Sequence, residues 1–426
     1  MTDCFVHASD LHLDAPLASL GSIDEETRSR LADEAKGAWN ALVNLTIEQS
    51  ASFLVLAGDV FDDGIAHPNV QRSFLDGLRL LGDSGIPVLI SHGNHDPLTE
   101  TLNWITDLPP TVTVFPAESP TTVEVALRHG GSAFVSGLSF AKRAETENLA
   151  LRFHDLDRPD GPHIAVLHAN LDGDEGHDPY APCSLDDLRN ARHIDYWALG
   201  HIHLRRTHRL GQDRYAAYCG NLQGRKLKPS ECHPKGALIV PIDDGKIGEP
   251  QFFECDRVRF VIDEIEVVPD DDIEDVLVRI EEAAGRAGFG AGARPVVWSF
   301  RLTGRHAEPD SIRDLLRADG GDSLERARSR LNGGGIARSE CRIHGHQTLS
   351  QLISDGSGFR ALVFKTLDQR AAVGGLVAKL IEDLPASIKD VFTSDREKTL
   401  GTDATLDEIV ERVEEILVAQ LGSADV

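Results

Sequence analysis

Short apolar segments alternate with amphipathic segments along the first hundred residues. Cys4–Ala8, Phe53–Ala57 and Pro87–Ser91 are apolar runs of strand length, and each is too short for an ordinary helix. Between them, residues 25–49 and 69–81 carry apolar positions at helical spacing. This order of strand, helix, strand, helix, strand predicts a parallel sheet with helices on its faces.

The pattern changes after Pro109-Pro110, where helical spacing becomes rare. Short strand-like runs follow one another at residues 112–115, 123–127, 133–135, 164–167, 196–199, 214–218 and 237–240. These runs predict a second sheet packed against the first. Two sheets with helices on their outer faces form a four-layer αββα sandwich, which is the α/β architecture that this order favours.

A further unit begins near Asp256. Its predicted elements are strands at 258–268 and 296–302 and helices at 273–284, 311–316 and 323–331. The glycine-rich run 332–335 then interrupts the pattern, and the remaining chain has mainly helical spacing. The sequence therefore predicts three successive domains, over residues 1–255, 256–331 and 332–426.

Composition is that of a globular protein, with 41% hydrophobic and 26% charged residues. There is no apolar run long enough for a membrane helix and no signal-like start, so we predict a cytoplasmic protein. The six cysteines form no CxxC pair, which favours buried thiols over a zinc site. The net charge of −26 argues against a broadly basic surface, although a site loaded with two divalent cations would be locally positive.

Five polar motifs each follow a strand-like run. They are Asp10-Leu11-His12, Gly58-Asp59-Val60-Phe61-Asp62, Gly93-Asn94-His95-Asp96, Leu167-His168-Ala169-Asn170 and Gly200-His201-Ile202-His203. Loops at the carboxyl ends of parallel strands meet in one crevice, so these distant residues can form one site. Carboxylate, amide and imidazole ligands suit manganese, iron, zinc or magnesium. Two such ions can clamp both oxygens of a phosphoryl transfer, and the set predicts a two-metal phosphoesterase.

This ordered set resembles the calcineurin-like metallophosphoesterase superfamily, which implies the αββα sandwich and two divalent metal ions. The resemblance assigns one metal to Asp10, His12, Asp59 and His203, and the other to Asp59, Asn94, His168 and His201, with Asp59 as the bridge. His95 resembles the family's catalytic histidine, which would protonate the leaving oxygen or stabilise transition-state charge. Asp96 has two interpretations: it orients the ring of His95, or it is an ordinary turn residue.

Three segments are similar to SbcD-type DNA repair exonucleases, and to their YhaO-like bacterial relatives in particular. Ser9–Leu17 resembles the start of those proteins, and Tyr218–Arg225 resembles the segment that closes their active site. Gly58–Asp62 is not followed by the arginine and glycine of protein phosphatases. The resemblance implies a manganese-dependent DNA nuclease that acts on ends or single strands, with residues 256–331 in the place of the capping domain.

Two basic clusters either contact phosphate groups or form ordinary solvated turns. They are Arg225, Lys226 and Lys228, and Arg205, Arg206 and Arg209. Two rival functions stay open: a small-molecule phosphodiesterase or pyrophosphatase with the same site, which the acidic charge favours, and a non-catalytic scaffold. The complete ligand set and His95 argue against the scaffold.

The last predicted helix, at 406–421, carries an apolar stripe behind the capping-box pair Thr405 and Glu408. The stripe either packs on the chain's own tail or binds another protein. SbcD-type nucleases bind an SMC-like ATPase through their C-terminal regions and often form homodimers. The resemblance therefore implies both partners here, besides the DNA substrate.

Overall fold

The computed structural model describes residues 2–62, 66–101, 107–158, 160–173, 178–306, 308–317 and 324–345. The helix predicted at 406–421, and with it the predicted ATPase-binding stripe, lies outside these residues. The chain divides into two compact units. The first contains the residues up to Ile262 together with Ala284–Ser299 and Arg328–Arg338, and the second takes up the chain at Asp263, Phe300 and Ser339. These units are interleaved along the sequence, whereas the predicted domains were consecutive.

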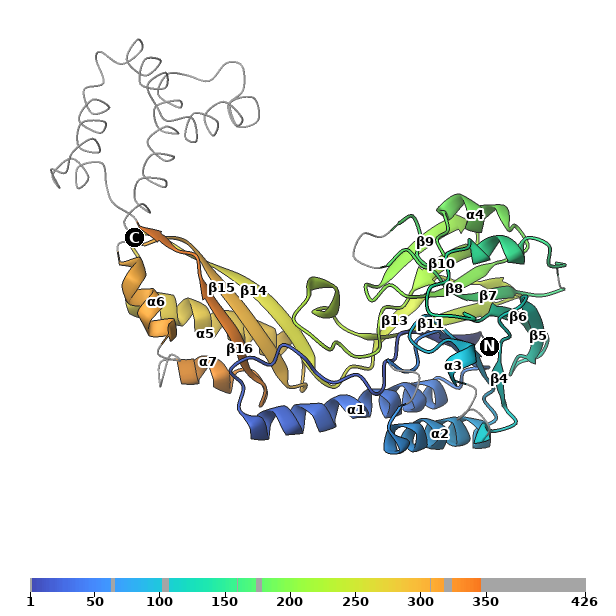
Figure 1. Cartoon of the computed structure of the whole chain (residues 1–426), viewed down its shortest axis with the longest axis horizontal. Helices are drawn as coiled ribbons and strands as arrows, with labels where there is room; N and C mark the ends of the chain where they lie inside the picture. The colour runs from blue at the N-terminus through green and yellow to red at the C-terminus, as the bar shows by residue number, and fades with distance from the viewer. Residues whose placement is uncertain are drawn as a thin grey trace, which may run out of the picture. The chain divides into compact units, whose positions relative to one another are not determined.

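The first unit contains two sheets (Figure 1). In the first sheet the strand order is β12-β11-β1-β2-β3-β4, and β13 pairs with β11. The strands are β1 (Asp3–Ala8), β2 (Leu54–Ala57), β3 (Val88–Ser91), β4 (Val112–Val114), β11 (Gly236–Asp243), β12 (Lys246–Ile247) and β13 (Gln251–Glu254). Strands β1 to β3 are parallel, as the alternating pattern predicted. The runs at 112–115 and 237–240, which the sequence assigned to the second sheet, instead extend the first, because β4 pairs in parallel with β3 and β11 pairs antiparallel with β1.

The second sheet has the order β5-β6-β7-β8-β10-β9. Its strands are β5 (Thr121–Ala126), β6 (Ser132–Leu138), β7 (His163–His168), β8 (Tyr196–Gly200), β9 (Arg206–Gly211) and β10 (Arg214–Tyr218). Strands β6, β7, β8 and β10 run parallel to one another. Strand β9 was not predicted, because its exposed, basic sequence lacks an apolar run and only its pairing with β10 makes it a strand.

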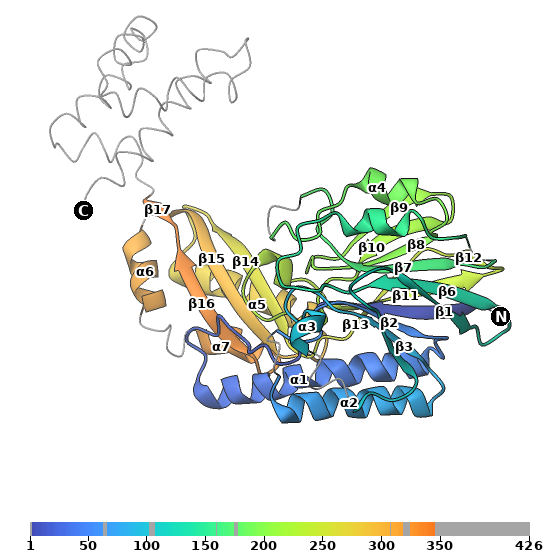
Figure 2. The ribbon, with the colours of Figure 1, turned by 45° about the vertical axis from the view of Figure 1, so that its right-hand side comes forward.

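Helices cover the outer faces of both sheets, which confirms the four-layer αββα sandwich (Figure 2). The long helices α1 (Glu25–Glu48) and α2 (Pro68–Asp83) pack on the first sheet. The 3₁₀ helix η2 (Leu149–Phe153) and α4 (Leu185–Asn190) pack on the second. The short helices α3 (Leu98–Thr101) and η3 (Pro229–Glu231) lie in loops. A separate cluster of buried apolar side chains fills the space between the sheets.

A third sheet has the order β14-β15-β16, with β17 beside β15. Its elements and the helices near them in sequence are β14 (Arg259–Val267), α5 (Ile273–Gly290), β15 (Val296–His306), α6 (Pro309–Arg317), α7 (Glu325–Ser329), β16 (Gly335–Cys341) and β17 (His344–Gly345). The sequence predicted a mainly helical region from residue 332. That prediction is wrong for residues 335–345, because Ile336 and Ala337 are buried and the segment gains its hydrogen bonds by pairing in the sheet.

Within the described ranges, no helix combines the length and the apolar character needed to cross a bilayer. The cytoplasmic location stays a prediction.

The core between the two sheets depends on aromatic packing around Phe5. Its ring stacks on Phe53 with centroids 4.8 Å apart and meets the edge of Tyr196 at 5.3 Å. All three side chains are fully buried. Phe5 therefore joins strands of both sheets through apolar contact.

We predict that Phe5→Ala lowers the free energy of unfolding by about 3–5 kcal/mol, because it leaves a cavity between the sheets. Chemical denaturation monitored by circular dichroism measures the change. Leu151→Ala is the control, because Leu151 is 46% exposed and its truncation removes little buried area. A loss for Phe5→Ala no larger than for the control would contradict the packing described.

Candidate functional site

All seven predicted metal ligands lie at or just beyond the ends of strands in the two sheets. Asp10 and His12 follow β1, Asp59 follows β2 and Asn94 follows β3, while His168 ends β7 and His201 and His203 follow β8. Six of the seven are at most 9% exposed, and His203 is half-buried. The fold therefore brings both sheets' strand ends to one place, as the parallel order predicted.

The backbone at this place is held in an uncommon conformation. Asp10, His12, Asp59 and His201 have φ values of 51°, 43°, 51° and 100°. Residues other than glycine rarely adopt positive φ, and such conformations persist only where the surrounding structure holds them. Four of the seven predicted ligands thus have their side chains aimed by a strained backbone.

Glycines in the motifs let the loops approach one another. A Cβ atom on Gly93 would lie 2.2 Å from Oδ1 of Asp59, and one on Gly200 would lie 1.8 Å from the carbonyl oxygen of Ala57. Neither position has room for a larger residue. These glycines therefore serve the packing of the site.

One half of the site contains Asp59, Asn94, His168 and His201. Nε2 of His168 lies 3.0 Å from Oδ1 of Asn94 and 3.3 Å from Oδ2 of Asp59. Nδ1 of His201 lies 3.2 Å from the same Asn94 oxygen. The four side chains predicted for one metal are therefore grouped around Asn94 and Asp59.

The other half contains Asp10, His12, His203 and again Asp59. The Nε2 atoms of His12 and His203 lie 3.2 Å apart. Nε2 of His12 is 3.8 Å from Asp59, and Nε2 of His203 is 3.9 Å from Asp10. Asp59 thus lies within 4 Å of a histidine in each half, His12 in one and His168 in the other. This is the position predicted for the bridging ligand.

The outer nitrogens of three histidines contact fixed acceptors. Nδ1 of His168 is 3.0 Å from the carbonyl oxygen of Ala57, and Nε2 of His201 is 2.7 Å from that of Asp178. Nδ1 of His203 is 2.6 Å from Oε1 of Glu231. We assign the proton of each ring to the nitrogen that faces its acceptor. The other nitrogen then faces the site, near Asp59 for His168, near Asp10 for His203 and near Asn94 for His201.

This donor set fits divalent cations. Inward-facing imidazole lone pairs and the carboxylates of Asp10 and Asp59 meet in a buried space, where acceptors without a cation or proton between them would repel one another. Burial lowers the pKa of His168, but the charge of Asp59 outweighs it and raises that pKa to about 9. Burial lowers the pKa of His201 to about 4, with a further contribution from His168. His201 is therefore neutral at pH 7, as a ligand must be.

His95 lies beside this cluster, and its ring is positioned by Asp62. Nδ1 of His95 is 3.0 Å from the backbone oxygen of Asp62 and 3.3 Å from its carboxylate. The rings of His95 and His12 meet edge to face, with centroids 4.9 Å apart. His95 is 40% exposed, so its outer edge is open to a substrate.

Asp96 occupies the position expected of a turn residue. It is fully buried, and its carboxylate accepts hydrogen bonds from the backbone N–H groups of Val60 and Gly93 at 2.8 and 2.9 Å. These bonds tie together two motif loops. Of the two interpretations offered by the sequence, the geometry favours the turn, and Asp62 is the carboxylate found beside the His95 ring.

Two of the basic residues considered for phosphate binding have other contacts. Arg225 donates from Nη1 to the carbonyl oxygen of Ala15 at 2.7 Å, and so braces the loop after Asp10. The guanidinium of Arg205 lies 3.9 Å above the ring of Phe252. These contacts account for both side chains without a phosphate.

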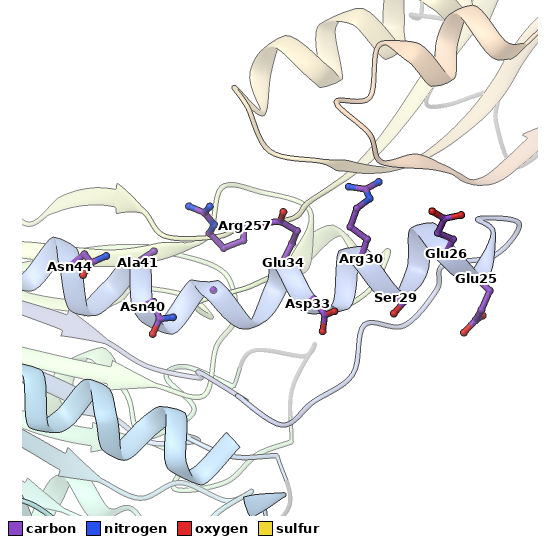
Figure 3. A pocket seen from close by; sticks show the side chains of 11 residues that line it. Glu25, Glu26, Ser29, Arg30, Asp33, Glu34, Asn40, Ala41, Asn44 and Arg257 are labelled. Carbon is purple, nitrogen blue, oxygen red and sulfur yellow. The ribbon is translucent and has the colours of Figure 1, made fainter. Parts of the chain in front are cut away.

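A groove along α1 is separate from the site. Acidic residues of α1, Arg30 and Arg257 line it, and no predicted ligand is among the lining residues (Figure 3). In Figure 3 the side chains of Arg30, Glu34 and Arg257 point to the same side of the helix. This groove therefore contributes nothing to the candidate metal site.

The site and the fold together resemble those of dinuclear metallophosphoesterases, and comparisons with known proteins point the same way. Residues 5–205 match the family described as calcineurin-like phosphoesterase. This region of the chain is therefore similar to the calcineurin-like phosphoesterases, a family whose members act with two divalent metal ions.

Curated relatives match more than half of the chain. The chain is 34% identical over 260 residues to the uncharacterized metallophosphoesterase YhaO of Bacillus subtilis, covering 61% of each chain. It is 28% identical to the DNA double-strand break repair protein Mre11 of Aeropyrum pernix, over 55% of this chain and 56% of that protein. The Mre11 protein of Sulfurisphaera tokodaii is 23% identical, over 60% and 64%. The match thus spans less than two thirds of each relative's length.

We predict that Gly93→Ala abolishes binding of both metal ions, because the added methyl group would displace Asp59 from its place between the two halves. Metal analysis after dialysis against Mn²⁺ measures the stoichiometry. Gly285→Ala is the matched control, since a Cβ there meets nothing within 4 Å. If Gly93→Ala still binds two ions per chain, the close approach of residue 93 to Asp59 is not required for metal binding, and the prediction is contradicted.

Proposed function

We propose that this protein is a manganese-dependent nuclease that hydrolyses phosphodiester bonds in DNA, at ends or in single strands, and serves DNA repair. The observation that carries the proposal is the convergence of the seven donor residues beside an exposed, carboxylate-paired histidine. The named Mre11 relatives support DNA as the substrate class. The mixed oxygen and nitrogen donor set supports manganese.

In this proposal Asp10, His12, Asp59 and His203 hold one ion, and Asp59, Asn94, His168 and His201 hold the other. When bound, the two cations supply charge neutralisation at the phosphate and a water of lowered pKa. The outer acceptors of His168, His201 and His203 fix which ring nitrogen faces the site. The strained turns of Asp10 and Asp59 keep the carboxylates directed inward.

His95 is the proposed proton donor to the leaving oxygen. Asp62 holds its Nδ1 edge, so the proton on Nε2 is presented on the exposed side of the ring. His95 and Asp62 therefore act together as an acid whose geometry is set before substrate binds.

A second candidate is a small-molecule phosphodiesterase or pyrophosphatase with the same site. The net charge of −26 favours it, because long nucleic acids are repelled by an acidic surface. The engagement of Arg225 and Arg205 in other contacts points in the same direction, since it removes two candidate phosphate contacts.

The assay that separates the candidates uses the full chain with Mn²⁺ on end-labelled double-stranded and single-stranded DNA, beside bis-p-nitrophenyl phosphate. We expect cleavage of DNA and of the small diester. Asp59→Ala should lose both activities and both metals, because each half of the site contains that carboxylate. Hydrolysis of the small diester with no cleavage of any DNA would favour the second candidate, and an active Asp59→Ala would overturn the assigned site.

For His95→Ala we expect unchanged metal content and DNA affinity, with a turnover rate lower by about 10²–10⁴, because only proton donation is removed. Single-turnover kinetics on saturating DNA, with metal analysis of the same sample, measures both. His129→Ala, which changes a histidine beside Asp3 on the far end of β1, is the control. Loss of metal in His95→Ala would make His95 a structural residue or a ligand.

The proposal extends to partners. An SMC-like ATPase would bind the C-terminal region, and a homodimer is expected by resemblance to SbcD-type nucleases. A chain ending at Gly401 tests the first: it should keep hydrolysing small diesters and lose association with the ATPase. An insoluble or strongly destabilised truncation would instead mean that the last helix belongs to the chain's own core.

A further inference from the structure

A buried carboxylate outside the five motifs is bonded to a predicted metal ligand. Glu231 ends the short helix η3 and is only 2% exposed. Its Oε1 lies 2.6 Å from Nδ1 of His203. Its Oε2 accepts hydrogen bonds from Nδ2 of Asn221 and from the backbone N–H of Arg225, both at 2.9 Å. Every contact is with the site loop that follows β10 or with His203.

The segment that carries Glu231 also holds the backbone of His203. Lys235 is 3% exposed, and its Nζ donates to the carbonyl oxygen of His203 at 2.7 Å. Burying a carboxylate and an ammonium group is costly unless both are bonded. Here the cost is offset by contacts that fix both the ring and the main chain of one residue. Residues 231–235 thus hold His203 from two sides.

Two of the other three predicted ligand histidines use backbone acceptors in the same position, whereas Nδ1 of the third, His12, lies 3.1 Å from Oδ1 of Asp62. His168 faces the carbonyl oxygen of Ala57, and His201 faces that of Asp178. Only a carboxylate adds a full negative charge to the acceptor, which makes the imidazole a stronger electron donor at its other nitrogen. His203 is also the most exposed of the seven ligands, so its ring has the least help from packing.

We propose that Glu231 is a positioning residue that fixes the Nδ1–H tautomer and the orientation of His203, so that Nε2 is presented to the metal beside Asp10 and His12. The proposal rests on the proposed role of His203 as a ligand. It concerns a residue that lies 28 positions beyond the last motif histidine.

A purely structural role is the rival explanation. Glu231 could serve only to hold Asn221 and the backbone of Arg225, with His203 as a bystander. The two explanations differ in the ring of His203 itself. A structural role predicts altered stability with an unchanged tautomer, whereas a positioning role predicts that the tautomer and the metal affinity change together.

The first measurement is the tautomer of His203 in metal-free full-length protein, labelled with ¹⁵N-histidine. His203→Ala identifies the signals of this ring among the 18 histidines. We expect a protonated Nδ1 in the wild type, a mixture of tautomers in Glu231→Ala, and the wild-type tautomer in Glu231→Gln, whose amide oxygen can still accept the bond. An unchanged tautomer in Glu231→Ala overturns the proposal.

The second measurement is Mn²⁺ binding by calorimetry. We expect Glu231→Ala to weaken one of two sites by about 10- to 100-fold, and Glu231→Gln to fall between it and the wild type. Asp195→Ala is the matched control: this carboxylate accepts from the N–H of His163 at the opposite ends of β7 and β8. It should cost stability and leave both affinities unchanged.

The outcomes separate this proposal from the function on which it rests. A wild-type protein that binds no divalent cation overturns the ligand assignment itself. Two sites of wild-type affinity in Glu231→Ala overturn only the role of Glu231. If Glu231→Ala does not fold, Glu231→Gln decides: lowered affinity at one site with the tautomer kept supports positioning by charge and geometry, and wild-type affinity contradicts it.

Discussion

Lone pairs of carboxylate and imidazole groups converge in a buried space where the strands of two sheets end. Asp10 and Asp59 bring negative charge into this space, and His168, His201 and His203 turn toward it the ring nitrogen opposite their outer acceptor. Such a group of acceptors is stable only with positive charge between them. Burial lowers the pKa of His168, but the charge of Asp59 outweighs burial and raises it. A proton on His168 therefore supplies part of the positive charge that these acceptors require. The folded chain thus places acceptors so close together that bound cations would stabilise it even without substrate.

The convergence of these ligands requires uncommon backbone conformations around the site. Several ligands have positive φ, and glycines stand where the loops come closest. These conformations are unfavourable in isolation and are maintained by the packed strands beneath them. Polar residues add further ties: Asp96 bonds the loops after β2 and β3 to each other, and Arg225 bonds the segment after β10 to the loop after β1. The site is therefore a single network of loops.

Two carboxylates that are not among the predicted site residues position its reactive groups. Asp62 sets His95, and Glu231 lies against His203. Sequence reasoning missed both partners. Glu231 stands in a polar, proline-containing segment that looks like an exposed turn, and its burial follows only from the way residues 229–235 fold over His203. Asp62 belongs to a motif, but its direction toward His95 depends on how the loops after β2 and β3 meet.

The sequence by itself determined the parallel order of β1 to β3, the αββα layers and the resemblance to calcineurin-like metallophosphoesterases. Those features depend on local periodicity and on polar residues at strand ends, which are visible along the chain. Only the tertiary structure decided the partner of His95, the hydrogen bond from Arg225 to Ala15 and the strand at 335–341. Each of these depends on a contact between segments that are distant in sequence. An arginine, a carboxylate or a weakly apolar segment can make several different contacts, and the sequence alone does not select one. Burial selects among them, and burial is a property of the folded chain.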